Sequence, residues 1–170
     1  MPVGEHQGAL MSIKPGDKLP SVDVFVMSEK GPSKMNSDEL FVGKKVVLFA
    51  LPGAFTPTCS AAHLPGYVVY ADDIKAKGID SIICLSVNDA FVMDAWGKAQ
   101  NVEDRIMMVA DGNGDFTRAI GLEMDGSGVG LGTRSQRYAM IVEDGVVTAL
   151  NVEAPRVFEV SSAEAILRQL

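Results

Sequence analysis

Short apolar runs alternate with amphipathic segments through the middle of the chain, and this alternation restricts the fold more than any other feature. Residues 44–50 and 79–87 are short and apolar, which is typical of buried strands. Between them, residues 60–77 place apolar side chains at steps of three and four, which predicts a helix with one buried face. The pattern therefore predicts a strand–helix–strand unit at the centre of the fold.

Two residues should shape this helix. Pro65 lies near its start and should kink it after the first turn, because proline has no N–H for the helical ladder. Gly78 follows its last predicted residue, Lys77, and ends it in the way that is usual for helix C-termini.

The alternation continues to the C-terminus. The further predicted elements are a helix at 88–100 capped by Asn88 or Asp89, a strand at 106–110, a helical turn at 116–120, a hairpin of strands 138–142 and 146–150 joined by Glu143-Asp144-Gly145, and a helix from Ser161 to Leu170. This order predicts an α/β fold with a central mixed sheet and helices on both faces. We find no internal repeat or linker, so we expect one domain at 13–170 after a flexible N-terminal lead at 1–12.

Composition excludes several classes of partner. The chain has 170 residues, 47% hydrophobic and 22% charged, with a net charge of -7, and an acidic surface repels nucleic acid. No apolar run approaches the roughly 18 residues that a membrane-spanning helix needs. The N-terminus lacks the basic start and apolar core of a secretory signal, so we expect a cytoplasmic protein that binds neither nucleic acid nor membrane.

The segment from Pro52 to Cys59 follows directly after the first strong strand, and Cys59 lies at the predicted start of the helix. A helix N-terminus exposes unpaired N–H groups and carries partial positive charge, so a thiol placed there loses its proton more readily. The thiolate is the nucleophilic form of cysteine. Thr56 could donate a hydrogen bond to the sulfur, and Pro52 and Pro57 should stiffen the loop.

This segment resembles the active-site signature of the peroxiredoxins, Pro-x-x-x-Thr-x-x-Cys, with matches at Pro52, Thr56 and Cys59. The longer run Pro-Gly-Ala-Phe-Thr-Pro-Thr-Cys-Ser and the later His-Leu-Pro-Gly are similar to the peroxiredoxin-5 (type II) subfamily, and so are residues 85–92, 96–97 and 151–153. The resemblance spans roughly 13–170. It implies a thioredoxin-like fold, a homodimer, and a reaction that needs neither a metal nor an organic cofactor.

The resemblance also implies roles for individual residues. The Cys59 thiolate would attack hydrogen peroxide or an organic hydroperoxide and become a sulfenic acid. Thr56 and a catalytic arginine would hold the peroxide in line, within a site that Pro52 partly shields. Arg137 directly precedes the aromatic-small-Met start of a strand and matches the family's arginine, with Arg134 as the fallback.

Cys84 has two interpretations. It lies in the continuous apolar run 82–85, where an inert buried thiol is expected. Alternatively it is a resolving cysteine, because plant type II members carry a second cysteine at this spacing. Residues 152–170 contain no cysteine, so the C-terminal resolving cysteine of other members is absent. We therefore expect an external reductant, with glutathione and glutaredoxin favoured and thioredoxin as the alternative.

His63 lies four residues after Cys59 and could share a helix face with it, which would suggest a Cys/His hydrolase. Pro65 should distort that turn, and no Asn or Asp is evident that would orient the imidazole. We therefore interpret His63 as a structural or surface residue.

Two other motifs are interpreted as loops. Residues 111–115 begin like a calcium-binding loop, but Phe116 and Leu122 occupy the positions that need Gly and Glu. The glycine-rich stretch 126–132 is followed by a predicted strand, whereas a dinucleotide-binding loop opens a helix.

The alternative function is a non-catalytic redox sensor or binding protein of thioredoxin fold that uses the same thiol. The combination of Pro52, Thr56, Cys59 and Arg137 favours the enzyme.

Overall fold

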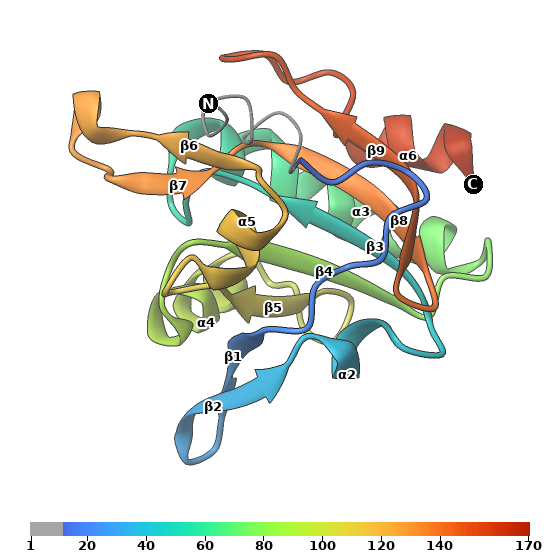
Figure 1. Cartoon of the computed structure of the whole chain (residues 1–170), viewed down its shortest axis with the longest axis horizontal. Helices are drawn as coiled ribbons and strands as arrows, with labels where there is room; N and C mark the ends of the chain where they lie inside the picture. Colours follow the sequence, from blue (N-terminus) through green and yellow to red (C-terminus); the bar gives the residue numbers. More distant parts are fainter. Residues whose placement is uncertain (1–11) are drawn as a thin grey trace, which may run out of the picture.

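The computed structural model describes residues 12–170, in which a seven-stranded sheet has the order β2-β1-β5-β4-β3-β8-β9 (Figure 1). Its strands are β1 (Asp23–Ser28), β2 (Gly31–Asn36), β3 (Lys45–Ala50), β4 (Ser81–Ser86), β5 (Met107–Ala110), β8 (Tyr138–Glu143) and β9 (Val146–Val152). A separate pair is formed by β6 (Glu123–Asp125) and β7 (Thr133–Ser135). The predicted flexible lead at 1–12 falls, except for Ser12, outside the described residues.

The large sheet is mixed, as predicted. β3, β4 and β5 are parallel to one another, whereas β8 is antiparallel to β3 and β1 is antiparallel to β5. β3 lies between β4 and β8 and is apolar on both faces, because Val47 and Phe49 pack into one core cluster while Val46 and Leu48 pack into the other.

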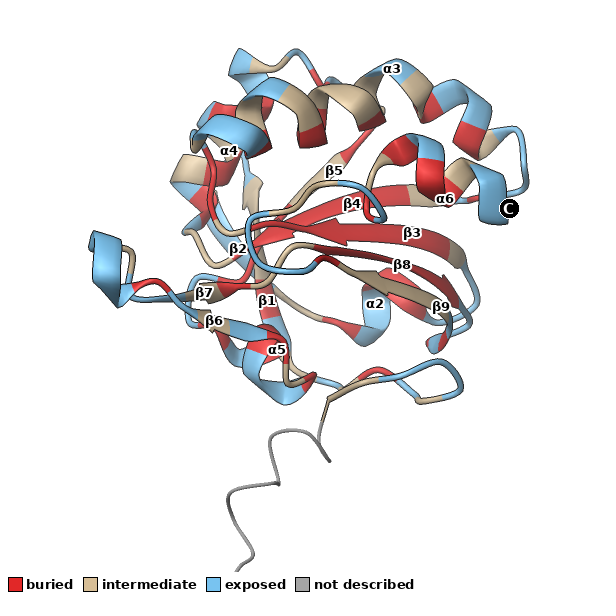
Figure 2. Cartoon of the chain, turned by 90° about the horizontal axis from the view of Figure 1, so that it is seen from above, coloured by how far each residue is buried: buried red, intermediate tan, exposed pale blue. Residues whose placement is uncertain are grey.

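Helices cover both faces of this sheet (Figure 2). One face carries α3 (Leu64–Lys75), α4 (Ala90–Ala99) and α6 (Ala163–Gln169), and the opposite face carries α2 (Asp38–Phe41) and α5 (Asp115–Ala119). This arrangement confirms the predicted α/β class. Within residues 12–170, no helix has the length and apolarity that a membrane crossing requires.

The helix after the first strong strand differs from the prediction. Helical backbone begins at Pro57, widens into a π-helical turn, η1 (Cys59–His63), and only then continues as α3. In a π turn the N–H of residue i+5 bonds the carbonyl of residue i, and Pro65 cannot donate to Ser60. The Gln100 side chain supplies that donor, with its Nε2 3.2 Å from the Ser60 carbonyl oxygen.

Three predicted details have clear counterparts. Asp89 caps α4, with its carboxylate accepting from the Val92 N–H at 2.9 Å. The β8–β9 hairpin turns at Asp144 and Gly145, whose φ angles of 49° and 79° are those of the type I′ turn that favours this pair. The last helix begins two residues later than predicted, because Ser162 is its N-cap.

Candidate active site

The candidate nucleophile lies beyond the carboxyl end of β3. Residues 51–58 leave β3 and lead into η1, and the side chain of Cys59 is fully buried at its first position. Two hydrogen bonds from the end of β4 and the residues after it fix the loop. The Asn88 Oδ1 accepts from the Ala54 N–H at 2.9 Å, and the Ser86 hydroxyl donates to the Leu51 carbonyl at 2.9 Å. The thiol is therefore held by a rigid loop rather than displayed on a mobile one.

Arg137 reaches the thiol. It immediately precedes β8, the antiparallel neighbour of β3, and its Nη2 donates to the Cys59 Sγ at 3.2 Å. Arg134 points elsewhere, with its Nη1 donating to the Pro52 carbonyl at 3.2 Å and its Nε donating to the Leu131 carbonyl at 2.9 Å. Of the two candidate arginines, Arg137 thus contacts the sulfur and Arg134 braces the loop.

His63 is the residue whose position the sequence interpretation missed. It is buried, and its Nδ1 lies 2.8 Å from the Arg137 Nη1 while its Nε2 lies 3.0 Å from the Ser161 carbonyl oxygen. Arginine only donates, so Nδ1 must accept and Nε2 must carry the proton. Burial, reinforced by the Arg137 charge, lowers the pKa of His63 to about 3, which keeps the imidazole neutral. The four-residue spacing between Cys59 and His63 was the available signal that the two side chains could lie on one face of the helix. Both residues belong to the π turn η1, and both are buried there.

Thr56 has its hydroxyl proton committed to the loop. Its Oγ1 donates to the Gly53 carbonyl at 2.6 Å instead of to the sulfur, which leaves the oxygen lone pairs as acceptors. The absence of a side chain at Gly53 lets Arg134 pack closely against the loop, because a Cβ at position 53 would lie 2.7 Å from the Arg134 Nη1.

Behind His63, the segment between β9 and α6 is anchored by a buried carboxylate. The Glu153 Oε2 accepts from the Ser161 N–H at 2.8 Å and from the Ser161 hydroxyl at 2.6 Å, and the Tyr67 hydroxyl donates to the Ser161 carbonyl at 2.8 Å. Burial acts to raise the pKa of Glu153, but hydrogen bonds from Ser161 and neighbouring N–H groups outweigh it and lower the pKa. An ionised carboxylate therefore fixes the carbonyl that orients His63.

Phe158 closes one side of this network. Its ring lies 5.0 Å from the His63 ring and 5.8 Å from the Arg137 guanidinium carbon, measured to the ring centroid. Beside it a cavity of about 630 Å³ is lined by Pro52, Thr58 and Arg137 together with residues of β6 and of the segment 153–158. Arg137, whose guanidinium contacts the Cys59 thiol, therefore forms part of the wall of this cavity.

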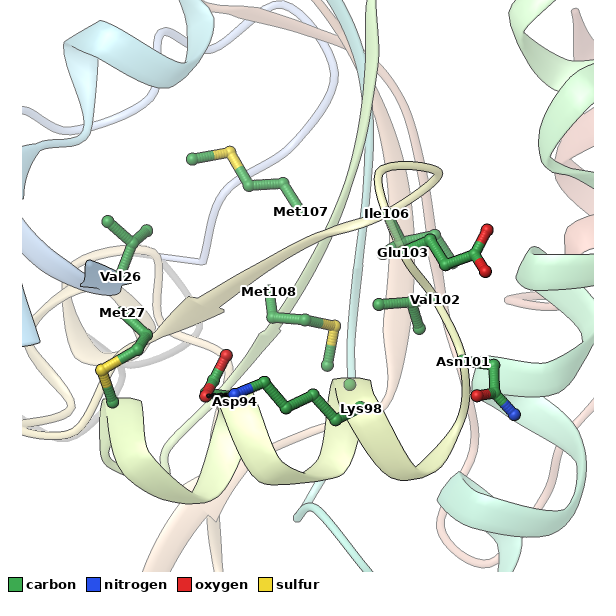
Figure 3. Close-up of a pocket in the computed structure, with 11 residues that line it drawn as sticks. Val26, Met27, Asp94, Lys98, Asn101, Val102, Glu103, Ile106, Met107 and Met108 are labelled. Atoms are coloured by element: carbon green, nitrogen blue, oxygen red, sulfur yellow. Dashed lines mark ion pairs between the residues drawn. The ribbon is translucent and has the colours of Figure 1, made fainter. Parts of the chain in front are cut away.

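A second cavity lies apart from this site, between α4, β5 and β1 (Figure 3). Met27 and Met108 line it, and the Asp94–Lys98 ion pair of α4, 3.0 Å long, lies at its edge. None of Pro52, Thr56, Cys59 and Arg137 lines it, so we assign it no part in thiol chemistry.

Cys84 lies in β4, paired with Phe49 of β3 and Met108 of β5. Its thiol is free and fully buried, in the same core cluster as Cys59. Burial, followed by the proximity of Cys59, raises the pKa of the Cys84 thiol. A thiol in this state is a poor nucleophile.

The described residues, 12–170, contain no group of three or more His, Cys, Asp or Glu side chains that could hold a metal ion.

Comparisons with known proteins identify the family of the chain. The family model described as Redoxin matches residues 14–167. Peroxiredoxin-2B of Arabidopsis thaliana is 47% identical over 91% of this chain and 96% of its own length, and the chloroplastic peroxiredoxin-2E of that plant is 50% identical over 94% of this chain and 70% of its own. The reduced Prx3 of Vibrio vulnificus in complex with H2O2 has a TM-score of 0.89 and 61% identity, covering 92% of this chain and 98% of that one.

The thioredoxin-like fold and the peroxiredoxin relatives define a thiol-dependent peroxidase of the Redoxin family, and the chain belongs to that family. Within it, the chain is a type II peroxiredoxin, as the identity to the plant enzymes shows.

Proposed function

We propose that the chain reduces hydrogen peroxide and organic hydroperoxides with Cys59 as nucleophile. The observation that carries this proposal is the 3.2 Å contact between the Arg137 Nη2 and the Cys59 Sγ, with the second guanidinium nitrogen held by a neutral His63. A fixed positive charge beside the sulfur attracts the peroxide oxygens and stabilises the charge that develops on them.

In the proposed reaction, the Cys59 thiolate attacks one peroxide oxygen and the O–O bond breaks. Cys59 becomes a sulfenic acid, and the other oxygen leaves with a proton as water or an alcohol. The Thr56 Oγ1, whose own proton is committed to Gly53, accepts the hydrogen bond of the peroxide O–H. Arg137 stabilises the charge that develops on the oxygens, and Pro52 shields the site from water.

The sulfenic acid is then reduced by an external thiol. Glutathione with glutaredoxin is the favoured pair and thioredoxin is the alternative, because Cys84 is deeply buried and residues 152–170 contain no cysteine. We further propose that the chain acts in the cytoplasm as a single domain at 13–170, although some relatives are chloroplastic. The reaction needs no metal or organic cofactor.

A homodimer is part of the proposal. Phe55, in the loop before Cys59, and Phe91, in the first turn of α4, are 57% and 63% exposed. The Ala54–Asn88 hydrogen bond joins the two segments that carry these rings. Large exposed apolar side chains beside a functional site are typical of an interface. Phe55 also has a φ of 64°, an unusual value for a residue other than glycine.

A coupled assay separates this enzyme from the alternative, a sensor that oxidises once and does not turn over. Peroxide, the protein, glutathione, glutaredoxin and glutathione reductase are mixed, and NADPH consumption is followed. Sustained consumption that is lost in Cys59→Ser supports the peroxidase. Consumption of one equivalent of peroxide per protein with no continuing consumption of NADPH supports the sensor.

A further inference from the structure

The cavity between β6 and the segment 153–158 adjoins the proposed reaction centre. Arg137 lines the cavity and also donates to the Cys59 sulfur. A molecule that contacts Arg137 from the cavity is therefore separated from the nucleophile by this side chain alone. Its volume of about 630 Å³ falls within the range of about 300–1,000 Å³ typical of small-molecule sites. The peroxide itself needs only a small part of this space.

The cavity carries one cation that has no partner. Arg156 is exposed and makes no ion pair or side-chain hydrogen bond among residues 12–170, whereas Arg137 is engaged by Cys59 and His63. Arg156 also holds a φ of 64° in the left-handed region, which is costly for a residue with a Cβ. A guanidinium presented in this way suits a carboxylate, which it can bind through two parallel hydrogen bonds.

Glu153, which lines the same cavity, carries an unpartnered acceptor. Glu153 is 7% exposed, and its Oε1 is buried without a hydrogen-bond partner, although its Oε2 accepts from the Ser161 and Glu159 groups. Buried carboxylate oxygens are seldom left unsatisfied, because desolvation without a partner is unfavourable. An ammonium or amide N–H would satisfy it.

Apolar side chains also line the cavity. Met124, Pro155 and Phe158 line the cavity, so a ligand there meets a cation, a buried anion and an apolar wall. A zwitterionic peptide with a short apolar stem has this combination of groups.

We propose that this cavity binds the peptide part of glutathione, with a carboxylate on Arg156 and an N–H donor on the Glu153 Oε1. This inference rests on the proposed function, in which glutathione reduces oxidised Cys59. The glutathione thiolate attacks the Cys59 sulfur, an S–S bond forms, and the S–O bond breaks with release of water. A second thiol then attacks the mixed disulfide, which frees reduced Cys59 and a disulfide of the two external thiols.

The kinetic test compares two reductants. The protein is oxidised with one equivalent of peroxide, and its reduction by glutathione and by 2-mercaptoethanol is timed in separate experiments. Arg156→Gly removes the guanidinium and tolerates the positive φ. We expect it to lower the ratio of the glutathione rate constant to the 2-mercaptoethanol rate constant about tenfold, as for loss of one charge-assisted contact. Arg168→Ala, at an exposed arginine of α6, is the control and should keep the wild-type ratio.

A binding test uses S-methylglutathione, which has no free thiol and cannot react. Calorimetry with the reduced protein should detect binding that weakens about tenfold in Arg156→Gly. Glu153→Gln should weaken it similarly, because an amide NH2 replaces an acceptor oxygen.

The outcomes separate this inference from the proposed function. If neither thiol reduces the oxidised wild-type protein, the proposed reaction fails. If both thiols reduce it and Arg156→Gly leaves their ratio unchanged, only the glutathione site is overturned. Absence of S-methylglutathione binding to the wild type overturns the site whatever the kinetics show.

Discussion

In the proposed reaction, Arg137 is the residue on which the chemistry of Cys59 depends most directly. We expect Arg137→Ala to slow oxidation of the protein by hydrogen peroxide about 10²–10³-fold, the usual cost of removing one preorganised donor to developing charge. Stopped-flow fluorescence of Trp96, whose Nε1 donates to the Ser60 hydroxyl beside Cys59, provides the signal. Arg134→Ala is the matched control. A slow Arg134→Ala with an unchanged Arg137→Ala would assign the role to the other arginine.

His63 makes the stability of the fold depend on pH. Its pKa is lowered from 6.5 to about 3 by burial and by Arg137, so the unfolded chain binds a proton that the folded chain does not. The contribution of neutral, buried His63 to the free energy of unfolding is therefore fully present above pH 6.5 and is lost as the pH falls toward 3. Between pH 7 and pH 5 the loss should be about 2 kcal/mol.

Urea denaturation of the wild type and of His63→Asn at both pH values measures this loss. Contributions from other groups, including Asp111 with its raised pKa, are common to both proteins and cancel in the comparison. The free energy of unfolding should fall by about 2 kcal/mol more in the wild type. Equal losses would show that His63 is charged in the folded state.

At the scale of elements, β4 determines what Cys84 can do. The strand is buried on both faces, and a disulfide requires Cα atoms within about 7 Å with suitably directed Cβ atoms. We expect Cys84→Ser to retain at least half of wild-type turnover with glutathione and glutaredoxin. A collapse of turnover, together with a Cys59–Cys84 disulfide found by mass spectrometry in the wild type, would make Cys84 the resolving cysteine.

The elements that the sequence predicted are those with strong local signals. The apolar runs of β3 and β4, the Asp89 cap and the Asp144-Gly145 turn each depend on neighbouring residues alone. β1, β2 and α2 were not predicted, because β2 is largely exposed and α2 has four residues. β6 and β7 have three residues each, too few to show a period.

The candidate site divides in the same way. Pro52, Thr56 and Cys59 lie within one short motif, so the sequence alone was sufficient to propose them. The contact of His63 with Arg137 joins positions 74 apart, and its contact with Ser161 joins positions 98 apart. Such contacts exist only after β8 and the segment before α6 have packed against η1, so no local pattern reports them.

For the whole molecule, we expect a homodimer in dilute solution. Light scattering of the reduced protein at micromolar concentration should give about twice the 18.1 kDa of one chain. Phe91→Glu should shift the mass toward the monomer, because a charge would be buried in the interface. Glu164→Lys, at an exposed position of α6, is the control. A wild-type mass near 18.1 kDa would contradict the dimer.

The central claim is that peroxide oxidises the sulfur of Cys59 and that an external thiol reduces it again. Intact mass spectrometry tests this claim most directly. The wild type treated with one equivalent of hydrogen peroxide should gain one oxygen atom, one equivalent of glutathione should then replace that oxygen with one glutathione, and excess glutathione should restore the original mass. Cys59→Ser should gain neither. An unmodified wild type, or a Cys59→Ser variant that gains the same oxygen and still consumes peroxide, would contradict the account.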